Sequence, residues 1–489
     1  METTKNLLGT RYRKMPSSVT TWWNLPPNPN LTYEEVLRSL TEAPVFPDST
    51  LQLYIHVPYC ALTCRFCCFS GANHNKLKTI DRFSRLVVQQ LKEMVNATKI
   101  RGRHVRSVYI GGGSPDHLGK EIGYILGEVR KLPGVDDRTE LTVEANYSTV
   151  SDEFLDELIH HNVTKFSCGV QSLDPKVREY MRLPKNLSKL WDIYNRLHGK
   201  VPLIDGDLLN GLPGQDRRIC LSDLTQMMEH PAVNCLSSYL YIPTGAPGVV
   251  AACATGELPA TPTQEEMALT RLLVFSQMQR RGWVRQGIET YMDPERVAPE
   301  LLERCPGNEG IGSRRYEDFL LAAGPMATSY VPGGRLENTN NLELWFSEME
   351  KGRQPFFLPK SVPGHQKDMT LWAFPLDKTG LPKKQYERIL EPGVCSEQQL
   401  RTFQEFVDEG LIVERPNGDG YELSILGQVF KGSIVADLKN PASRATLDAQ
   451  IAEGFELAKA IASGMLKDGN AINDRQSAEK ALRVLEARK

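Results

Sequence analysis

The sequence of 489 residues contains no run of about eighteen apolar residues, so it does not predict a membrane-spanning helix. Its first ten residues, METTKNLLGT, lack the apolar core of a signal peptide. Neither sign of charge is in excess, because 58 lysines and arginines stand against 60 aspartates and glutamates, for a net charge of -2. These absences predict a cytoplasmic protein with no membrane partner and no need of a nucleic-acid partner.

Disulfide bonds are not expected either, although the chain contains ten cysteines. A disulfide framework is typical of short secreted proteins, whereas this chain is long enough for one large domain and one or two small ones. The compartment is therefore expected to be reducing. Thiolates that lie close together in the sequence then become candidate metal ligands.

Three cysteines, Cys60, Cys64 and Cys67, follow a short apolar run in the segment YIHVPYCALTCRFCCF, with the spacing C-x3-C-x2-C. Thiolate sulfur suits zinc or iron–sulfur, and cluster sites normally use four cysteines. A three-cysteine site would leave one iron with an open coordination position, as a catalytic metal site needs. The adjacent Cys68 should point away from the same iron. A zinc knuckle or a disulfide pair is the alternative, but no C-x2-C or H-x3-H pair follows to complete a zinc site.

The cysteine segment resembles the cluster-binding loop of the radical S-adenosylmethionine (SAM) enzymes, and YIHVPYC is typical of their oxygen-independent coproporphyrinogen III oxidase-like subfamily. The resemblance runs from about residue 51 to about residue 438. It implies a [4Fe-4S] cluster held by Cys60, Cys64 and Cys67, with SAM bound at the open iron and cleaved reductively to a 5′-deoxyadenosyl radical. A small-molecule substrate and an electron donor such as flavodoxin or ferredoxin are implied as partners.

From residue 51 onward, short runs rich in Val, Ile and Tyr alternate with helical patterns. Six strand–helix units in sequence predict an α/β fold with a parallel sheet, and the resemblance implies a partial (β/α)6 radical SAM barrel. Such barrels carry their chemistry at the carboxyl ends of the strands. Strands are expected at 51–57, 105–110, 140–144, 165–170, 203–209 and 235–241. Helices are expected at 33–41, 81–97, 120–132, 152–160, 176–180, 187–197, 221–229 and 264–281.

Several motifs are expected at these strand ends. Gly111, Gly112 and Gly113 follow the second strand, where the lack of a Cβ lets the backbone approach a ligand. The turn resembles the GGGTP motif of the family, which implies contact with the amino group of SAM. Glu144 ends the third strand and Gln171 follows the fourth. Each could merely cap the next helix, but the resemblance implies polar contacts with SAM.

Asp207, at the end of the fifth strand, is a further implied SAM contact. Arg182 stands where the family carries an arginine near a nucleoside carboxylate, although its surroundings, MRLPKN, depart from the usual pattern. Tyr54 and Phe66 could be core residues, since an aromatic between ligating cysteines is commonly buried. The resemblance instead implies a place beside the adenine, where a π-face suits a flat base.

Tyr239 and Tyr241, in the sixth strand, are the candidate catalytic-site residues, interpreted as pocket wall and not as acid–base groups. The segment FLLAAGPMATSY at 319–330 resembles the GLGPGAHSY turn that closes the active site of the family, with Ala322 and Met326 in place of glycines. Loss of glycine narrows the backbone conformations available there. The resemblance implies that Ala323, in the same segment, contacts the cofactor.

Five segments are expected along the chain: an N-terminal arm at 1–50, the radical SAM core at 51–250, a barrel-closing substrate segment at 251–368, a small winged-helix-like α+β domain at 369–440, and a helical tail at 441–489. Trp22 and Trp23 in the arm are expected to pack on the main domain, with a substrate lid as the alternative. A winged-helix domain could bind DNA, but its charge is mixed and no basic recognition helix stands out.

Two missing residues, a cysteine and a histidine, narrow the group within the subfamily that this chain can resemble. Phe69 occupies the position of a further cysteine in the porphyrinogen-decarboxylating enzymes, and GNEGIGSRRYEDF lacks the histidine of the HNxxYW motif of the haem chaperones. The chain therefore most resembles the class C radical SAM methylases, which include haem-ring-opening methylases and cyclopropane-forming enzymes and hold two SAM molecules at once. An unsaturated aromatic, natural-product or tetrapyrrole substrate is expected, in a packed apolar pocket. Decarboxylation of a porphyrinogen and haem binding without turnover stay open.

Overall fold

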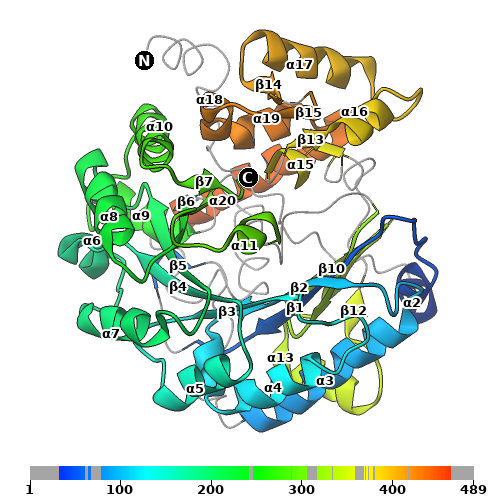
Figure 1. Cartoon of the computed structure of the whole chain (residues 1–489). Coiled ribbons are helices and arrows are strands. Elements are labelled where there is room, and N and C mark those ends of the chain that lie inside the picture. Colours follow the sequence, from blue (N-terminus) through cyan, green and yellow to red (C-terminus); the bar gives the residue numbers. More distant parts are fainter. Residues whose placement is uncertain are drawn as a thin grey trace.

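The computed structural model shows a layered α/β protein built around one large sheet (Figure 1). Trp22, Trp23, Cys68, Phe69 and the tail beyond residue 463 lie outside the residues that it describes. Those residues are 32–60, 64–67, 79–241, 246–287, 289–304, 317–332, 334–357, 368, 371–372, 374–377, 380–416 and 418–463.

The described strands form a large sheet of twelve strands in the order β12-β11-β10-β9-β1-β2-β3-β4-β5-β6-β8-β7. Its six central strands pair with one another in parallel, which confirms the α/β fold and the parallel core predicted from the sequence. They are β1 (Leu51–Val57), β2 (Val105–Gly112), β3 (Glu140–Ala145), β4 (Lys165–Gln171), β5 (Leu203–Asn210) and β6 (Cys235–Leu240).

The sheet extends beyond the predicted strands at both edges. β9 (Phe319–Ala323) pairs with β1 in parallel, in the segment that the sequence predicted only as a turn. Beyond it lie three antiparallel strands, and two more lie outside β6. These are β10 (Thr328–Val331), β11 (Gly334–Asn338), β12 (Phe356–Phe357), β8 (Thr290–Met292) and β7 (Val284–Arg285).

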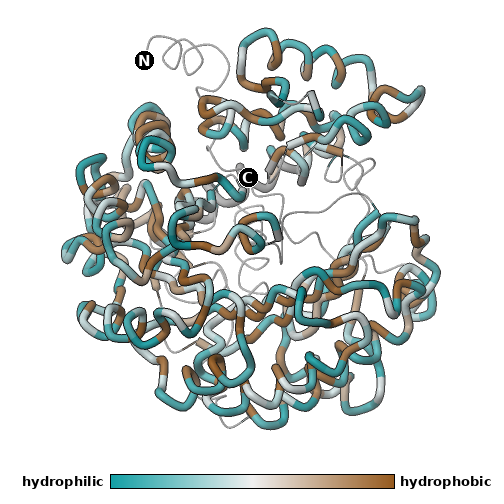
Figure 2. Tube along the Cα trace, viewed as in Figure 1, coloured by the Kyte–Doolittle hydropathy of each residue, from teal (hydrophilic) through white to brown (hydrophobic). Residues whose placement is uncertain are grey.

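Helices cover one face of the central strands (Figure 1). α3 shows why: its residues Phe83, Val87, Leu91 and Met94 recur at helical spacing and are buried, so the helix presents one apolar stripe to the sheet. Hydrophobic residues gather on the strands and on the helix turns that face them (Figure 2). The layer comprises α3 (Ile80–Ala97), the 3-10 turn η2 (Pro115–Leu118), α4 (Glu121–Val129), α5 (Asp152–His160), α6 (Pro175–Tyr180), α7 (Ser188–Leu197) and α8 (Arg217–Glu229).

A second, three-stranded sheet follows near the C-terminus, with the order β13-β15-β14. This unit contains both helices and strands, as the sequence predicted for the winged-helix-like α+β segment. The boundaries of the domain stay a prediction. Tyr291 of β8 donates a hydrogen bond to Gln428 at 3.1 Å, and one apolar core runs through both parts. The unit contains β13 (Leu381–Pro382), β14 (Ile412–Glu414), β15 (Gly420–Leu423), α15 (Phe374–Asp377), α16 (Lys383–Ile389), α17 (Glu397–Asp408), α18 (Ile425–Val429) and α19 (Lys431–Asp437).

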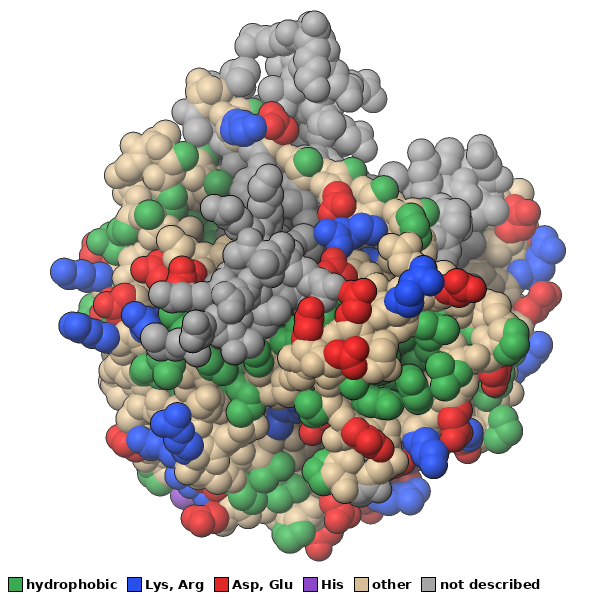
Figure 3. All heavy atoms as spheres, turned by 90° about the horizontal axis from the view of Figure 1, so that it is seen from above, with side chains coloured by type: hydrophobic (Ala, Val, Ile, Leu, Met, Phe, Trp, Pro, Cys, Tyr) green, Lys and Arg blue, Asp and Glu red, His purple; other side chains and the backbone are tan. Residues whose placement is uncertain are grey.

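The last described helix, α20 (Pro441–Ala462), returns from this unit to the large sheet. It packs against α9 (Pro247–Ala254), the helix that follows β6, as Figure 1 also shows. On the face seen in Figure 3, acidic and basic side chains are interspersed. The remaining helices are α2 (Tyr33–Thr41), α10 (Gln264–Arg280), α11 (Pro299–Arg304) and α13 (Leu342–Glu350).

Candidate functional site

The inner face of the central strands, opposite the α3 to α8 layer, carries most of the candidate site. Side chains alternate between the two faces of a strand, and the outward set, such as Leu53, Ile55 and Val143, belongs to the main apolar core. The inward set is largely polar or aromatic: Tyr54 and His56 on β1, Tyr109 and Gly111 on β2, Glu140 and Glu144 on β3, Lys165 and Ser167 on β4, Asp205 and Asp207 on β5, and Ser237 and Tyr239 on β6.

The three motif cysteines lie beyond the carboxyl end of β1 and are half-buried. Cys67 donates its backbone N–H to the carbonyl of Cys64 at 3.1 Å, which closes a tight turn, and Arg65 N–H is anchored on the Met181 carbonyl at 3.2 Å. Burial, together with the nearby thiols of Cys67 and Cys60, raises the pKa of Cys64 to about 12. Three thiols that oppose one another's ionisation in a partly buried turn fit a cationic iron–sulfur cluster, which would stabilise the thiolates.

The arrangement of the possible metal ligands also bears on whether the cysteines bind a single zinc ion. Within the described ranges, no three His, Cys, Asp or Glu side chains gather around a point that one metal ion could occupy. A [4Fe-4S] cluster attaches each cysteine to a different iron, so its ligands need not converge on a single ion. The described cysteines are therefore compatible with a cluster.

The glycine turn after β2 packs directly against the cysteine segment. A Cβ on Gly113 would collide with the Tyr59 carbonyl, and one on Gly112, whose φ is +113°, would lie 2.9 Å from the His56 ring. Gly113 and Ser114 donate their N–H groups to the carbonyls of Val57 and Tyr59 at 2.7 and 2.6 Å. The sequence predicted that these glycines admit a ligand; the structure adds that they let β2 and the cysteine segment pack backbone to backbone.

Glu144 lies on the inner face near the carboxyl end of β3. Its carboxylate accepts hydrogen bonds from the Tyr109 hydroxyl and from the Gly112 N–H, the latter at 3.3 Å. Burial raises the pKa of Glu144, while the Tyr109 and Gly112 hydrogen bonds lower it. A Cβ on Gly111 would strike this carboxylate, so glycine at 111 makes room for Glu144. A half-buried carboxylate near a strand end is suited to a cationic ligand group.

Asp207 lies on β5, which is separated from β3 by β4, and the Ser167 hydroxyl of β4 donates to its Oδ2 at 2.8 Å. Burial, reinforced by the carboxylates of Asp205 and Glu144, raises its pKa well above the usual value. Asp205, below it on the same strand, pairs with Lys165 at 2.8 Å, and both side chains are fully buried. The inner face therefore has more carboxylates than cations at β3 to β5.

Two predicted SAM contacts have strained backbones. Gln171 at the end of β4 has φ of +68° and Arg182 has φ of +55°, in the left-handed region that non-glycine residues rarely adopt. Gln171 is half-buried beside Gly169, where a Cβ would lie 2.7 Å from its Nε2. Arg182 is exposed. Strain of this kind clusters at functional sites, but both residues share it, so it does not distinguish them. The contact of Gln171 with SAM stays a prediction, and the exposed Arg182 does not lie in the inner-face group.

The two tyrosines of the sixth strand segment lie in different surroundings. Tyr239 faces Asp207 on the inner face, and burial with the nearby carboxylates raises its pKa well above the usual value. Tyr241 is buried in an apolar cluster with Met181 and Val249, against which Cys64 and Phe66 pack. Phe66 thus lies on an apolar wall beside the cysteine turn, as a base-stacking residue would require.

The last two residues of β9, Ala322 and Ala323, lie on opposite faces of the sheet. Ala322 is in the inward cluster with Tyr54 and Tyr330, whereas Ala323 is in the outward main core. The predicted contact of Ala323 with the cofactor is therefore not supported by the direction of its side chain. Met326 has φ of +65°, in the left-handed region that glycine adopts readily, at a position where the family pattern has a glycine.

Sequence reasoning missed residues that hold the site together. Gln90 of α3 is fully buried, accepts from the Gly324 N–H at 2.8 Å and from the Trp345 indole at 3.1 Å, and donates to Asn338 at 2.7 Å. Tyr109 and the Lys165–Asp205 pair were read only as strand residues. Counting alternate positions along each predicted strand would have placed Tyr109, Lys165 and Asp205 on the same face as Glu144.

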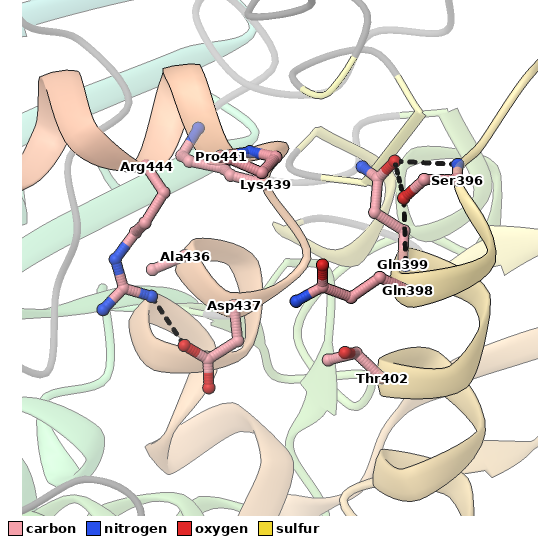
Figure 4. Close-up of a pocket in the computed structure, with 9 residues that line it drawn as sticks. All are labelled: Ser396, Gln398, Gln399, Thr402, Ala436, Asp437, Lys439, Pro441 and Arg444. Carbon is pink, nitrogen blue, oxygen red and sulfur yellow. Dashed lines mark hydrogen bonds and ion pairs between the residues drawn. The ribbon is translucent and has the colours of Figure 1, made fainter.

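A cavity of about 380 Å³ lies elsewhere, between α17, α19 and α20 (Figure 4). Arg444 points toward Asp437, with 2.6 Å between Nη1 and Oδ1, and burial lowers the pKa of Lys439 to about 8. None of the predicted site residues lines this cavity.

A family model described as the radical SAM superfamily matches residues 54–219, which include the cysteine turn, the glycine turn, Glu144, Gln171 and Asp207. The chain carries a radical SAM domain. Such domains use a [4Fe-4S] cluster and SAM, and the cysteine turn and the inner-face carboxylates described above fit both. None of the helices in the described ranges is long and apolar enough to cross a membrane.

Named relatives of this radical SAM chain have several functions. Anaerobilin synthase of Escherichia coli O157:H7 is 26% identical over 323 residues, which cover 63% of this chain and 66% of that protein. The heme chaperone HemW of Haemophilus influenzae is 32% identical over 193 residues, which cover 37% of this chain and 48% of that protein. The chain thus spans about half to two thirds of the length of these relatives.

Among solved structures, coproporphyrinogen III oxidase (HemN) from Escherichia coli, a radical SAM enzyme, matches with a TM-score of 0.66 and 18% identity. The match covers 86% of this chain and 97% of that chain. The fold of the radical SAM chain is therefore shared with HemN well beyond the matched domain.

Proposed function

We propose that this radical SAM enzyme uses two SAM molecules to methylate or cyclopropanate an unsaturated sp2 carbon of a flat aromatic, natural-product or tetrapyrrole substrate. The observation that carries the proposal is the division of the inner face into an acidic side and an apolar, aromatic side. The acidic side lies on β3 to β5, and the aromatic side on β1, β2, β9 and β10.

The acidic side suits SAM, which carries a sulfonium and an ammonium. Glu144, Asp205 and Asp207 approach one another there with Lys165 as the nearby cation. Burial makes each unneutralised carboxylate costly, so a cationic ligand would relieve the repulsion between them. An anionic substrate group such as a propionate would find no comparable partner at these three strands.

The aromatic side suits a flat, unsaturated substrate. It consists of a compact cluster separate from the main core, formed by Tyr54, Tyr109, Leu320, Ala322, Ala327, Tyr330 and Val435. Aromatic faces bind flat rings, and the small alanines limit crowding between them. Val435 comes from α19, so the C-terminal unit contributes to the same wall.

When bound, the cluster and SAM supply a 5′-deoxyadenosyl radical, with electrons from a donor such as flavodoxin or ferredoxin. The residues of this chain bind, orient and keep out water. Burial and the nearby carboxylates raise the pKa of Tyr239 well above its usual value, so its hydroxyl keeps its proton. Tyr239 therefore acts as wall and hydrogen-bond donor, and the rate depends on positioning.

The named relatives and the shared fold suggest two alternative activities, which the experiment below must distinguish from methylation. HemN is named a coproporphyrinogen III oxidase and HemW a heme chaperone, and either activity could be carried by this fold. The sequence disfavours both, because Phe69 stands at the position of the additional cysteine and GNEGIGSRRYEDF has no histidine.

The test is anaerobic incubation of the reconstituted protein with SAM and dithionite, in parallel with haem and with coproporphyrinogen III. The proposal predicts 5′-deoxyadenosine and S-adenosylhomocysteine together, and a substrate mass raised by a one-carbon unit. Protoporphyrinogen formation without S-adenosylhomocysteine would instead indicate decarboxylation. Stoichiometric haem binding with little of either product would indicate a chaperone. The Cys60→Ala protein, which should lack the cluster, is the control for SAM breakdown in solution.

A further inference from the structure

Tyr109 is the inward residue of β2 that lies two positions before the glycine turn. Its side chain is 3% exposed, and its hydroxyl donates a short hydrogen bond to Glu144 Oε1. The other carboxylate oxygen of Glu144 accepts the Gly112 N–H at 3.3 Å. Two donors from one strand thus hold both oxygens of the carboxylate, one from a side chain and one from the backbone.

The packing shows that this arrangement is built into the strand. A Cβ on Gly111 would lie 2.9 Å from Tyr109 Cε1 and would strike the Glu144 carboxylate. Any other residue at 111 would therefore push the phenol and the carboxylate apart. The neighbouring Tyr54 ring, at a centroid distance of 6.1 Å from Tyr109, closes the other side, and its own hydroxyl is engaged with His56 Nδ1 at 3.0 Å.

We propose that Tyr109 is a positioning residue for SAM binding, which orients the Glu144 carboxylate and keeps it ready for the ammonium of SAM. The inference rests on the proposed function, which assigns Glu144 to SAM. A carboxylate oxygen has two acceptor positions, so each oxygen can hold its donor from β2 and still accept a ligand N–H.

The charged groups around Glu144 determine how this contact responds to pH. Burial raises its pKa, Asp205 adds to the rise, and Tyr109, Gly112 and Lys165 lower it. Asp207 and Tyr54 also interact with it, and burial lowers the pKa of nearby His56 to about 4, so that ring is neutral. Glu144 binds a cation only when it is ionised. SAM affinity should therefore be present above the Glu144 pKa and be lost as pH falls through it.

Removing the Tyr109 hydroxyl takes away a hydrogen bond that lowers the Glu144 pKa. The pKa should rise, and the pH at which SAM affinity is lost should rise with it. Tyr109→Phe should also weaken SAM binding by about tenfold near neutral pH, since a hydrogen bond to a charged group is lost. A residue with only a structural role would not shift the pH profile.

The experiment is equilibrium binding of SAM to cluster-reconstituted protein across a pH series, without turnover. Tyr194→Phe is the matched control, because Tyr194 is also fully buried, while its hydroxyl bonds to the Asp205 carbonyl at 3.3 Å and to the Cys168 thiol and not to Glu144. It should leave affinity and pH profile unchanged. A Tyr109→Phe protein with the wild-type pH profile would overturn the inference.

Two further variants separate the possible failures. If Glu144→Gln binds SAM like the wild type, the assignment of Glu144 in the proposed function fails. If Glu144→Gln weakens binding but Tyr109→Phe does not shift the profile, only the role of Tyr109 fails. Should Tyr109→Phe not load the cluster, replacement of Tyr109 by 3-fluorotyrosine supplies a stronger donor. That protein should keep SAM affinity to lower pH than the wild type, and an unshifted profile would again contradict the proposal.

Discussion

At the scale of single residues, the site depends on which groups lack a Cβ and which are forced into unusual backbone conformations. Gly111, Gly112 and Gly113 each border a group that a Cβ would strike or crowd, namely Glu144, His56 and Tyr59. Gly324, with φ of +103°, similarly borders the His56 carbonyl. The cysteine turn, the carboxylate and the β9 turn are thus joined through glycine contacts, because glycine lets the backbone approach these groups closely.

The cysteines give the first prediction at this scale. Replacing Cys60, Cys64 or Cys67 with alanine should abolish cluster loading, because each removes one of three thiolate ligands. Cys68→Ala is the control and should retain the cluster. The measurement is iron content together with the brown absorbance of the reconstituted protein. A colourless Cys68→Ala protein would show that the ligand set is different.

Met326 gives a second prediction, on stability. Its φ of +65° is tolerated poorly by side chains and worst by β-branched ones. Met326→Val should therefore be less stable than Met326→Gly, by about 1–2 kcal/mol. Thermal unfolding of both variants in the same buffer measures the difference. Equal melting temperatures would mean that the turn relaxes to a negative φ.

At the scale of elements, the buried Lys165–Asp205 pair links β4 to β5 inside the barrel, and the Ser237 hydroxyl of β6 also donates to Asp205 at 2.9 Å. Breaking a buried pair leaves an uncompensated charge, so Lys165→Met should lower the free energy of unfolding by about 3–5 kcal/mol. The measurement is the urea midpoint at unchanged slope.

The exposed pair Lys185–Glu179, with side chains 72% and 65% exposed, provides the control for this loss. Lys185→Met should change the midpoint little, since surface pairs contribute little. If Lys165→Met behaved like Lys185→Met, the buried pair would not link the strands in the way described.

The sequence predicted those elements whose pattern is local. The six central strands and most of the intervening helices lie within a few residues of their predicted bounds, because Val-, Ile- and Tyr-rich runs alternate clearly with amphipathic helices. β9 to β12 and α9 were missed. β9 is five residues long and pairs with β1 across more than half of the chain, so nothing in its local pattern indicates the partner.

The candidate site shows the same division. The spacing of the cysteines and the strand-end position of Glu144 depend only on residues close together in the sequence, so they could be predicted. The opposite directions of Ala322 and Ala323 depend on the register of β9 against β1, where Tyr54 pairs with Ala322 and Ile55 with Ala323. A one-residue change of register would exchange them, and sequence alone does not determine it.

At the scale of the whole molecule, the C-terminal part is joined to the radical SAM domain at several places. Val435 of α19 packs in the inner-face cluster with Tyr54 and Tyr109, and α20 packs against α9 next to the apolar wall of Tyr241 and Phe66. The C-terminal segments therefore contribute to the surroundings of the site, although the matched domain ends at residue 219. Substrate specificity is expected to depend on them.

The central claim is that two SAM molecules lie together on the inner face, so that the radical formed from one meets the methyl group of the other. The most direct measurement is anaerobic incubation of the reconstituted protein with dithionite and SAM that carries a trideuterated methyl group, followed by mass spectrometry of the 5′-deoxyadenosine. Because the donor methyl must lie within near-attack range, we expect one deuterium in the 5′-deoxyadenosine, and label from the same methyl in the product when substrate is present. Unlabelled 5′-deoxyadenosine during turnover would contradict the claim and favour hydrogen abstraction from the substrate, as in decarboxylation.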